Sequence, residues 1–139
     1  MPGGVRTEIH LTGDHTADAF CLLIDEPPAG WSLPPHRHRG EAETIHVIDG
    51  EFEIDIDGRQ VSLASGESIH IPAGVVHSGR NSGDRPGRRL LIFSPAGMER
   101  FFIEAGAATP EVEIDQAQAL ASAISHGWEF VAGESRPPR

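Results

Sequence analysis

Glycine and proline divide this chain into many short pieces. The 139 residues include 16 glycines and 11 prolines, and both types are spread along the sequence rather than concentrated in one part. Short pieces separated by turn signals are typical of an antiparallel sandwich or barrel. The sequence therefore predicts an all-β fold built from short strands.

Several of these pieces have the pattern of strands. The clearest is Glu51–Asp57, in which apolar and acidic residues alternate strictly before an Asp-Gly turn signal. Its apolar face holds Phe52, Ile54 and Ile56. Further strands are predicted over Ala17–Asp25, Thr44–Ile48, Gln60–Leu63, Ser68–Ile71 and Arg89–Ser94.

The last third of the chain changes character. A short helix is predicted over Met98–Ala105, and a capping-box pattern predicts a second helix over Gln116–His126. Gly127–Val131 has the pattern of a short terminal strand, and residues 133–139 that of a frayed tail.

No repeat or linker divides the sequence, so residues 1–139 are predicted to form a single domain. We expect a barrel core over about residues 13–97 and a C-terminal helical extension over about residues 98–131.

Composition excludes several classes of function. The formal net charge is -10, which argues against a nucleic-acid partner because such proteins need a cationic stripe. All basic residues are arginine, so lysine-based Schiff-base chemistry is excluded. The single cysteine allows no internal disulfide, and the chain shows neither a signal peptide nor an apolar span long enough to cross a membrane. We therefore expect a cytoplasmic protein with no membrane or nucleic-acid partner.

Histidines and one glutamate carry the strongest chemical signal. His36 and His38 are two residues apart, so on a strand their imidazoles point to the same face. A chain reversal through Arg39-Gly40 would bring Glu43 back beside them, and His77 follows a proline-glycine turn that can present a third imidazole. Three neutral imidazoles and one carboxylate suit a first-row divalent ion and leave coordination positions open for substrate or dioxygen.

These residues stand in two motifs that resemble those of the cupin family, with every fixed position present. The pattern G(X)5HXH(X)3,4E(X)6G is matched by Gly30, His36, His38, Glu43 and Gly50. The pattern G(X)5PXG(X)2H(X)3N is matched by Gly66, Pro72, Gly74, His77 and Asn81. Within the family, the chain is most similar to small bacterial single-domain cupins described as quercetin-dioxygenase-like, over roughly Gly13 to Val131.

The resemblance implies a cupin-type jelly-roll β-barrel with short C-terminal helices. It also implies one divalent transition metal per chain, bound by His36, His38, Glu43 and His77. Iron, manganese, nickel, cobalt, copper and zinc all accept this ligand set. Burial of these four groups without a metal would be costly, which favours a metal over a metal-free polar site.

One position departs from the family pattern, because the residue three beyond the glutamate, often Tyr or Phe, is His46 here. By alternation from Glu43, His46 points away from the metal with Thr44, so it is left out of the ligand set. By the same alternation, the side chain of His70 points to the opposite face of its strand from those of Ile69 and Ile71.

Parity also predicts the character of the cavity. Ile45 lies on the same face as Glu43, and the apolar face of the Glu51–Asp57 strand is directed to the same interior. No arginine is assigned to an inward position by parity, and the Arg85 to Arg89 cluster is expected to form a solvated turn. The expected ligand is therefore an uncharged, fairly apolar small molecule that supplies its own chelating oxygens.

Other conspicuous side chains have structural interpretations. We expect Cys21 to be a buried, inert thiol and Phe101 and Phe102 to pack on a core. Trp31 precedes the first histidine motif, where either a gating or a packing role is open.

Three functions fit this sequence. The leading hypothesis is a quercetinase-like dioxygenase, in which Glu43 acts as both metal ligand and general base toward a flavonol-like or enol/diketone substrate. The alternatives are a non-redox metal-dependent isomerase or lyase, and a small-molecule-binding cupin without enzymatic activity. Because Ala19–Ile24 is apolar on both faces, we also expect a homodimer.

Overall fold

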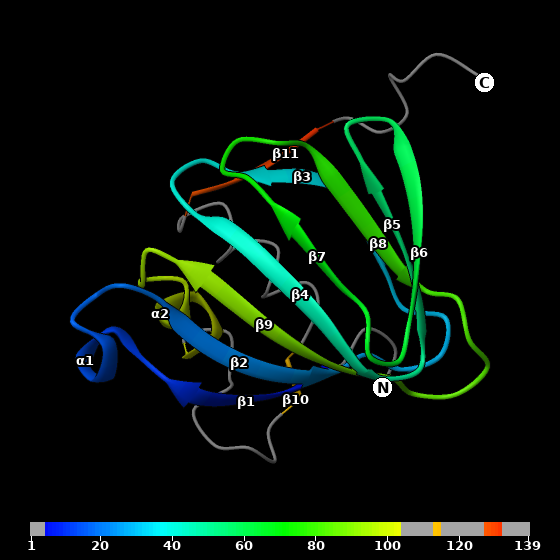
Figure 1. Ribbon diagram of the computed structural model, residues 1–139, viewed down its shortest axis with the longest axis horizontal. Coiled ribbons are helices and arrows are strands. Elements are labelled where there is room, and N and C mark those ends of the chain that lie inside the picture. The colour runs from blue at the N-terminus through cyan, green and yellow to red at the C-terminus, as the bar shows by residue number, and fades with distance from the viewer. Residues whose placement is uncertain (1–4, 104–112, 115–126, 132–139) are drawn as a thin grey trace.

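Two antiparallel sheets face one another in this computed structural model, which describes residues 5–103, 113–114 and 127–131 (Figure 1). The larger sheet has the strand order β10-β1-β2-β9-β4-β7. Its strands are β1 (Val5–Leu11), β2 (Cys21–Glu26), β4 (Ala42–Asp49), β7 (Ser68–Ile71), β9 (Arg88–Ser94) and β10 (Glu113–Ile114).

The smaller sheet has the order β11-β3-β8-β5-β6. Its strands are β3 (Ser32–His38), β5 (Glu51–Ile56), β6 (Arg59–Ala64), β8 (His77–Asn81) and β11 (Trp128–Phe130). Within the described ranges, no strand of one sheet pairs with a strand of the other. The all-β jelly-roll prediction is confirmed, with two facing sheets that are not closed into a continuous barrel.

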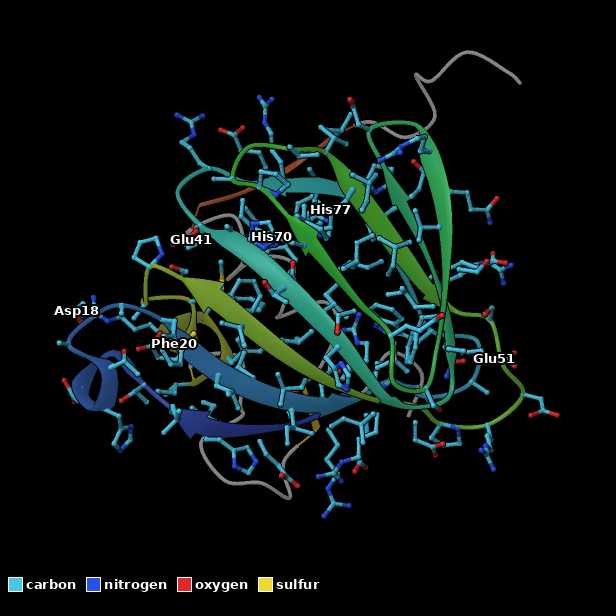
Figure 2. All side chains as sticks on the ribbon, in the orientation of Figure 1. Asp18, Phe20, Glu41, Glu51, His70 and His77 are labelled. Atoms are coloured by element: carbon cyan, nitrogen blue, oxygen red, sulfur yellow. The ribbon has the colours of Figure 1, made fainter. Side chains whose placement is uncertain are left out.

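Alternation along the strands fills the space between the sheets with apolar side chains (Figure 2). On β5 the buried residues are Phe52, Ile54 and Ile56, and the next turn has positive φ at Asp57 and Gly58, as expected for a tight hairpin. On β4 the buried residues are Glu43, Ile45 and Val47. The inward faces expected from parity are therefore confirmed.

The strand expected from residue 17 begins only at Cys21, because a short helix precedes it. This helix, α1 (Gly13–Thr16), is capped by the Thr12 side chain, and both Ala17 and Asp18 have positive φ. A left-handed backbone is incompatible with an extended strand, so the chain turns before β2 starts.

The C-terminal part is described only in pieces. α2 (Glu99–Phe102) lies within the predicted Met98–Ala105 helix, and β11 lies within the predicted Gly127–Val131 strand. The helix predicted over Gln116–His126 and the tail over residues 133–139 fall outside the described residues. No helix among those that the structure describes is long and apolar enough to span a membrane.

Candidate metal centre

Three strands from both sheets bring the predicted site residues together. His36 and His38 lie two apart on β3, and His36 is the register partner of His77, the first residue of the neighbouring β8. Glu43 comes from the opposite sheet, on β4, and faces them across the interior. The convergence expected from spacing is therefore present in the fold.

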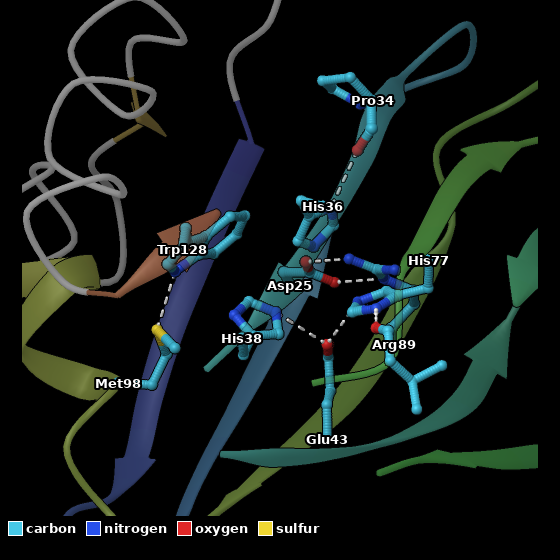
Figure 3. A network of polar contacts seen from close by, with 10 residues as sticks. Asp25, Pro34, His36, His38, Glu43, His77, Arg89, Met98 and Trp128 are labelled. Atoms are coloured by element: carbon cyan, nitrogen blue, oxygen red, sulfur yellow. Dashed lines mark hydrogen bonds and ion pairs between the residues drawn. The ribbon is translucent and has the colours of Figure 1, made fainter. Parts of the chain in front are cut away.

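The four side chains form a tight, buried cluster (Figure 3). One ligand atom from each of His36, His38 and His77 lies within 4.8 Å of the others. The Oε1 atom of Glu43 is 3.4 Å from His38 Nε2 and 3.3 Å from His77 Nε2. All four residues are at most 6% exposed.

Backbone carbonyls orient two of the imidazoles. The Nδ1 atom of His36 lies 2.8 Å from the Pro34 carbonyl oxygen, and that of His77 lies 3.0 Å from the Val75 carbonyl oxygen. With Nδ1–H donating to these oxygens, each Nε2 retains a lone pair toward the cluster.

Some of the buried nitrogens have no hydrogen-bond partner in the described part of the chain. They are Nε2 of His77 and both ring nitrogens of His38, and the two Nε2 atoms have only the ion-pair contacts with Glu43 described above. Buried polar atoms without a partner are costly, and a coordinated cation would use these lone pairs. Imidazole and carboxylate are also the ligands that first-row divalent ions prefer, so the residues fit a transition metal.

The electrostatics of the cluster give His36 and Glu43 the protonation states that metal ligands need, whereas the Glu43 carboxylate outweighs burial and raises the pKa of His77. Burial, together with the adjacent His77 and His38 imidazoles, lowers the pKa of His36 to about 3. Burial alone would raise the pKa of Glu43, but the imidazoles of His38 and His77 outweigh it and hold this pKa below its usual range. A neutral His36 and an ionised Glu43 therefore coexist near neutral pH.

An aromatic wall surrounds the histidines. The Trp128 ring stacks on the His36 ring at 4.8 Å between centroids and 14° between planes, and its Nε1–H donates to the Met98 sulfur at 3.0 Å. Phe93 meets His38 edge-on at 5.5 Å. Trp128 was missed as a site residue, because only the pairing of β11 with β3 brings it beside the histidines.

A cavity of about 110 Å³ adjoins the cluster and has mostly apolar walls. Phe101 and Phe102 are buried, as expected, and both also line this cavity. Half-buried Trp31 lines it too.

The expectation that Arg89 lies in a solvated turn is wrong. Arg89 is an inward residue of β9, in alternation with Leu91 and Phe93, and is 6% exposed. Its Nε and Nη2 atoms donate to the two carboxylate oxygens of Asp25 at 3.0 and 2.7 Å (Figure 3). The cavity wall is therefore not wholly apolar.

Side chains expected outside the site are indeed elsewhere. The Nδ1 atom of His46 lies 2.7 Å from Ser68 Oγ, and that of His70 lies 2.9 Å from Thr44 Oγ1, both in exposed contacts between β4 and β7. Cys21 is fully buried, and burial, followed by the nearby Glu99 charge, raises the pKa of its thiol to about 12.

Comparison with known proteins places this geometry in a family. Over 89 residues the chain is 35% identical to quercetin 2,3-dioxygenase of Bacillus subtilis (strain 168), covering 64% of this chain and 26% of that protein. It is 32% identical over 94 residues to polyketide synthase CurC of Streptomyces cyaneus, covering 67% and 60%. The chain thus spans less than two thirds of either relative.

The solved structure of KdgF from Halomonas sp. has a TM-score of 0.62, with 20% identity over 72% of this chain and 86% of that one, and so shares the fold. The family model described as a cupin domain matches residues 22–93, more than half of the 139 residues. These residues include the three clustered histidines and Glu43, so the chain belongs to the cupin family.

Proposed function

We propose that this chain is a metal-dependent dioxygenase acting on a small chelating substrate, flavonol-like or an enol or diketone. The observation that carries the proposal is the convergence of three buried imidazoles and one carboxylate beside an apolar cavity. His36, His38, Glu43 and His77 would hold the ion. The similarity to a protein named quercetin 2,3-dioxygenase supports oxygen chemistry for this site.

When bound, a divalent transition ion would supply Lewis acidity toward the chelating oxygens of the substrate and the redox chemistry needed with dioxygen. Glu43 would act as the general base. Its carboxylate is ionised near neutral pH and has a free lone pair to accept the acidic proton of an enol that binds beside it. Because its lowered pKa makes it a weak base, this transfer would rely on the bound ion to acidify the enol. His38 and His77 flank the same oxygen atom and fix its position.

The size and lining of the cavity favour the smaller members of this substrate class. Pockets for drug-sized ligands usually have volumes of about 300 to 1,000 Å³. At about 110 Å³, this cavity suits a compact enol or diketone better than a complete flavonol. The aromatic wall formed by Phe93, Phe101 and Trp128 limits the access of water to a bound enolate.

The test begins with metal analysis of protein purified without a metal-binding tag, for which we expect one transition ion per chain. Oxygen uptake is then measured with pentane-2,4-dione and with quercetin. Anaerobic pentane-2,4-dione should shift its absorbance on binding, and admission of oxygen should consume it, whereas quercetin should bind more weakly because the cavity is small. Glu43→Gln keeps the shape of the side chain but removes the base, so we expect oxygen uptake to fall about 100-fold or more.

His46→Gln is the matched control on the same strand, because His46 lies on the outer face and should leave oxygen uptake unchanged. Lack of turnover with every first-row metal would contradict the proposal. Turnover without oxygen in zinc-loaded protein would instead indicate an isomerase or lyase. A ligand that raises the melting temperature and yields no product by mass spectrometry would indicate a binding protein.

A further inference from the structure

A buried ion pair shares the cavity with the metal cluster. Asp25 on β2 and Arg89 on β9 are register partners, and both side chains line the cavity. They are 4% and 6% exposed. The Arg89 guanidinium carbon lies 4.7 Å from the centre of the Trp31 ring and 5.3 Å from that of Phe52, so two aromatic side chains hold the guanidinium in place.

Stability does not account for this pair. Desolvation of two charges costs about as much as their attraction returns, and well-packed apolar side chains at such positions are often equally or more stabilising. The neighbouring wall already consists of such residues, among them Ile45, Ile54 and Leu91. A guanidinium in this place therefore calls for a role in binding.

The guanidinium retains unused donors. It carries five N–H groups, of which Asp25 accepts one from Nε and one from Nη2. The remaining N–H groups of Arg89 have no acceptor among the residues that the structure describes. Because Arg89 lies on the cavity wall, these donors are available to a molecule inside the cavity.

The balance of charges around the cavity indicates the charge of the ligand that it binds. Three charged side chains line the described part of the cavity: the carboxylates of Asp25 and Glu43 and the guanidinium of Arg89. With a divalent ion and neutral histidines, the interior then holds a single net positive charge. In a poorly solvated cavity, one negative charge on the ligand balances it.

We propose that Arg89 is a specificity-determining residue that binds an anionic oxygen of the substrate, and that Asp25 is the positioning residue that orients the guanidinium. This inference rests on the proposed function and narrows its substrate class to small oxygen acids bound as monoanions, such as an enolate or a carboxylate. It replaces the uncharged ligand expected from the sequence.

Equilibrium binding tests the inference without turnover. The zinc-loaded protein is titrated calorimetrically with benzoate, a planar monoanion, and with benzamide, its neutral counterpart of almost equal shape. Wild-type protein should bind benzoate in preference to benzamide. In a variant without the Arg89 guanidinium, the lost hydrogen bond to a charged group should weaken benzoate binding about tenfold or more relative to wild type. Benzamide binding in the same variant should stay within about twofold of wild type.

The variants separate binding from folding. Arg89→Met alone leaves the Asp25 carboxylate buried and unpaired, so it risks unfolding. The double variant Asp25→Leu with Arg89→Met replaces the pair by apolar side chains and should keep the wild-type melting temperature and zinc content. Its interior keeps the same net charge and loses only the hydrogen bond from Arg89, so its preference for benzoate should fall about tenfold or more relative to wild type. Asp25→Asn should do the opposite and strengthen benzoate binding, because it frees the guanidinium from a competing carboxylate.

Unchanged benzoate affinity in the folded double variant would overturn the inference, as would a wild-type protein that does not bind benzoate at millimolar concentrations. If Asp25→Asn weakened the binding of benzoate and benzamide equally, the Asp25–Arg89 pair would be purely structural. That result would also overturn the inference. Failure of the dioxygenase proposal appears separately, as absence of oxygen uptake, and leaves these binding ratios unaffected.

Discussion

Cys21 illustrates how position determines the chemistry of a residue. It is the only cysteine of the chain, and it lies at the start of β2 with no exposed surface. A thiolate at this site would have to form in a desolvated environment near the Glu99 carboxylate, and the pKa of about 12 reflects both effects. Since thiolate is the reactive form, the thiol should be inert near neutral pH.

We therefore expect Cys21 to resist a disulfide reagent at pH 8 in the native protein and to react fully after denaturation. The raised pKa also has a consequence for stability. The unfolded chain loses its thiol proton near pH 9 while the folded chain keeps it to about pH 12. Between these values, the free energy of unfolding should fall by up to about 1.4 kcal/mol per pH unit.

Chemical denaturation across this pH range measures the slope, and Cys21→Ala is the control. The variant should lack the part of the slope that belongs to the thiol. Rapid stoichiometric labelling of the native protein at pH 8 would show that Cys21 is accessible.

Individual residues also show where inference from sequence stops. Alternation placed Glu43 inside and His46 outside, because it depends only on neighbours along one strand. The inward position of Arg89 follows the same alternation on β9, but its charge argued for the surface. Only its pairing with Asp25, 64 residues away, makes burial tolerable, and no local pattern shows such a partner.

At the scale of elements, β11 is short but closely tied to the metal cluster. Its pairing with β3 sets Trp128 opposite His38 and Phe130 opposite His36. Glu129 accepts a hydrogen bond from Arg37 at 2.7 Å on the outer side of the same pair of strands. The terminal strand thereby secures the outer edge of the strand that carries two of the histidines.

Trp128→Ala should therefore reduce both stability and metal affinity. Removal of a buried tryptophan side chain costs about 3 to 5 kcal/mol, and the His36 ring would lose the surface on which it stacks. Denaturant unfolding of the metal-free protein and competition with a metal chelator measure the two effects. Trp128→Phe, which keeps an aromatic ring, should recover most of both, whereas wild-type metal affinity in Trp128→Ala would contradict the role given to β11.

Elements differ in how well the sequence predicts them. The β5 strand was predicted closely because its two faces differ sharply in polarity. The β1 strand was missed, since its buried position Thr7 is polar and weakens the alternation. β8 was missed for a related reason, because a glycine, an arginine and an asparagine fill much of His77–Asn81. The neighbours of these strands, rather than their own composition, keep them in the sheet.

On the scale of the whole molecule, the cluster bridges the two sheets. Three of its side chains come from the smaller sheet and one from the larger, in a region where the described strands of the two sheets do not pair with each other. An ion bound by all four would link the sheets at the centre of the fold. Ion binding should therefore favour the folded state of the entire chain.

Removal of the metal tests this coupling. With free ion at about 1,000 times its dissociation constant, binding stabilises the folded protein by about 4 kcal/mol. We expect a chelator to lower the melting temperature by several degrees and added metal to restore it. Scanning calorimetry with confirmed metal loss provides the measurement, and an unchanged melting curve would show that the metal has no share in stability.

The two tryptophans give this protein a property that its catalytic chemistry does not require. The sequence contains no tyrosine, and both Trp31 and Trp128 lie on the cavity wall. Trp31 faces the Arg89 guanidinium, while Trp128 stacks on the His36 imidazole. Indole emission from the native protein therefore originates entirely at the site, with one fluorophore beside the ion pair and one beside the histidines. Single Trp→Phe variants turn the chain into two separate optical sensors, one for the ion pair and one for the histidines.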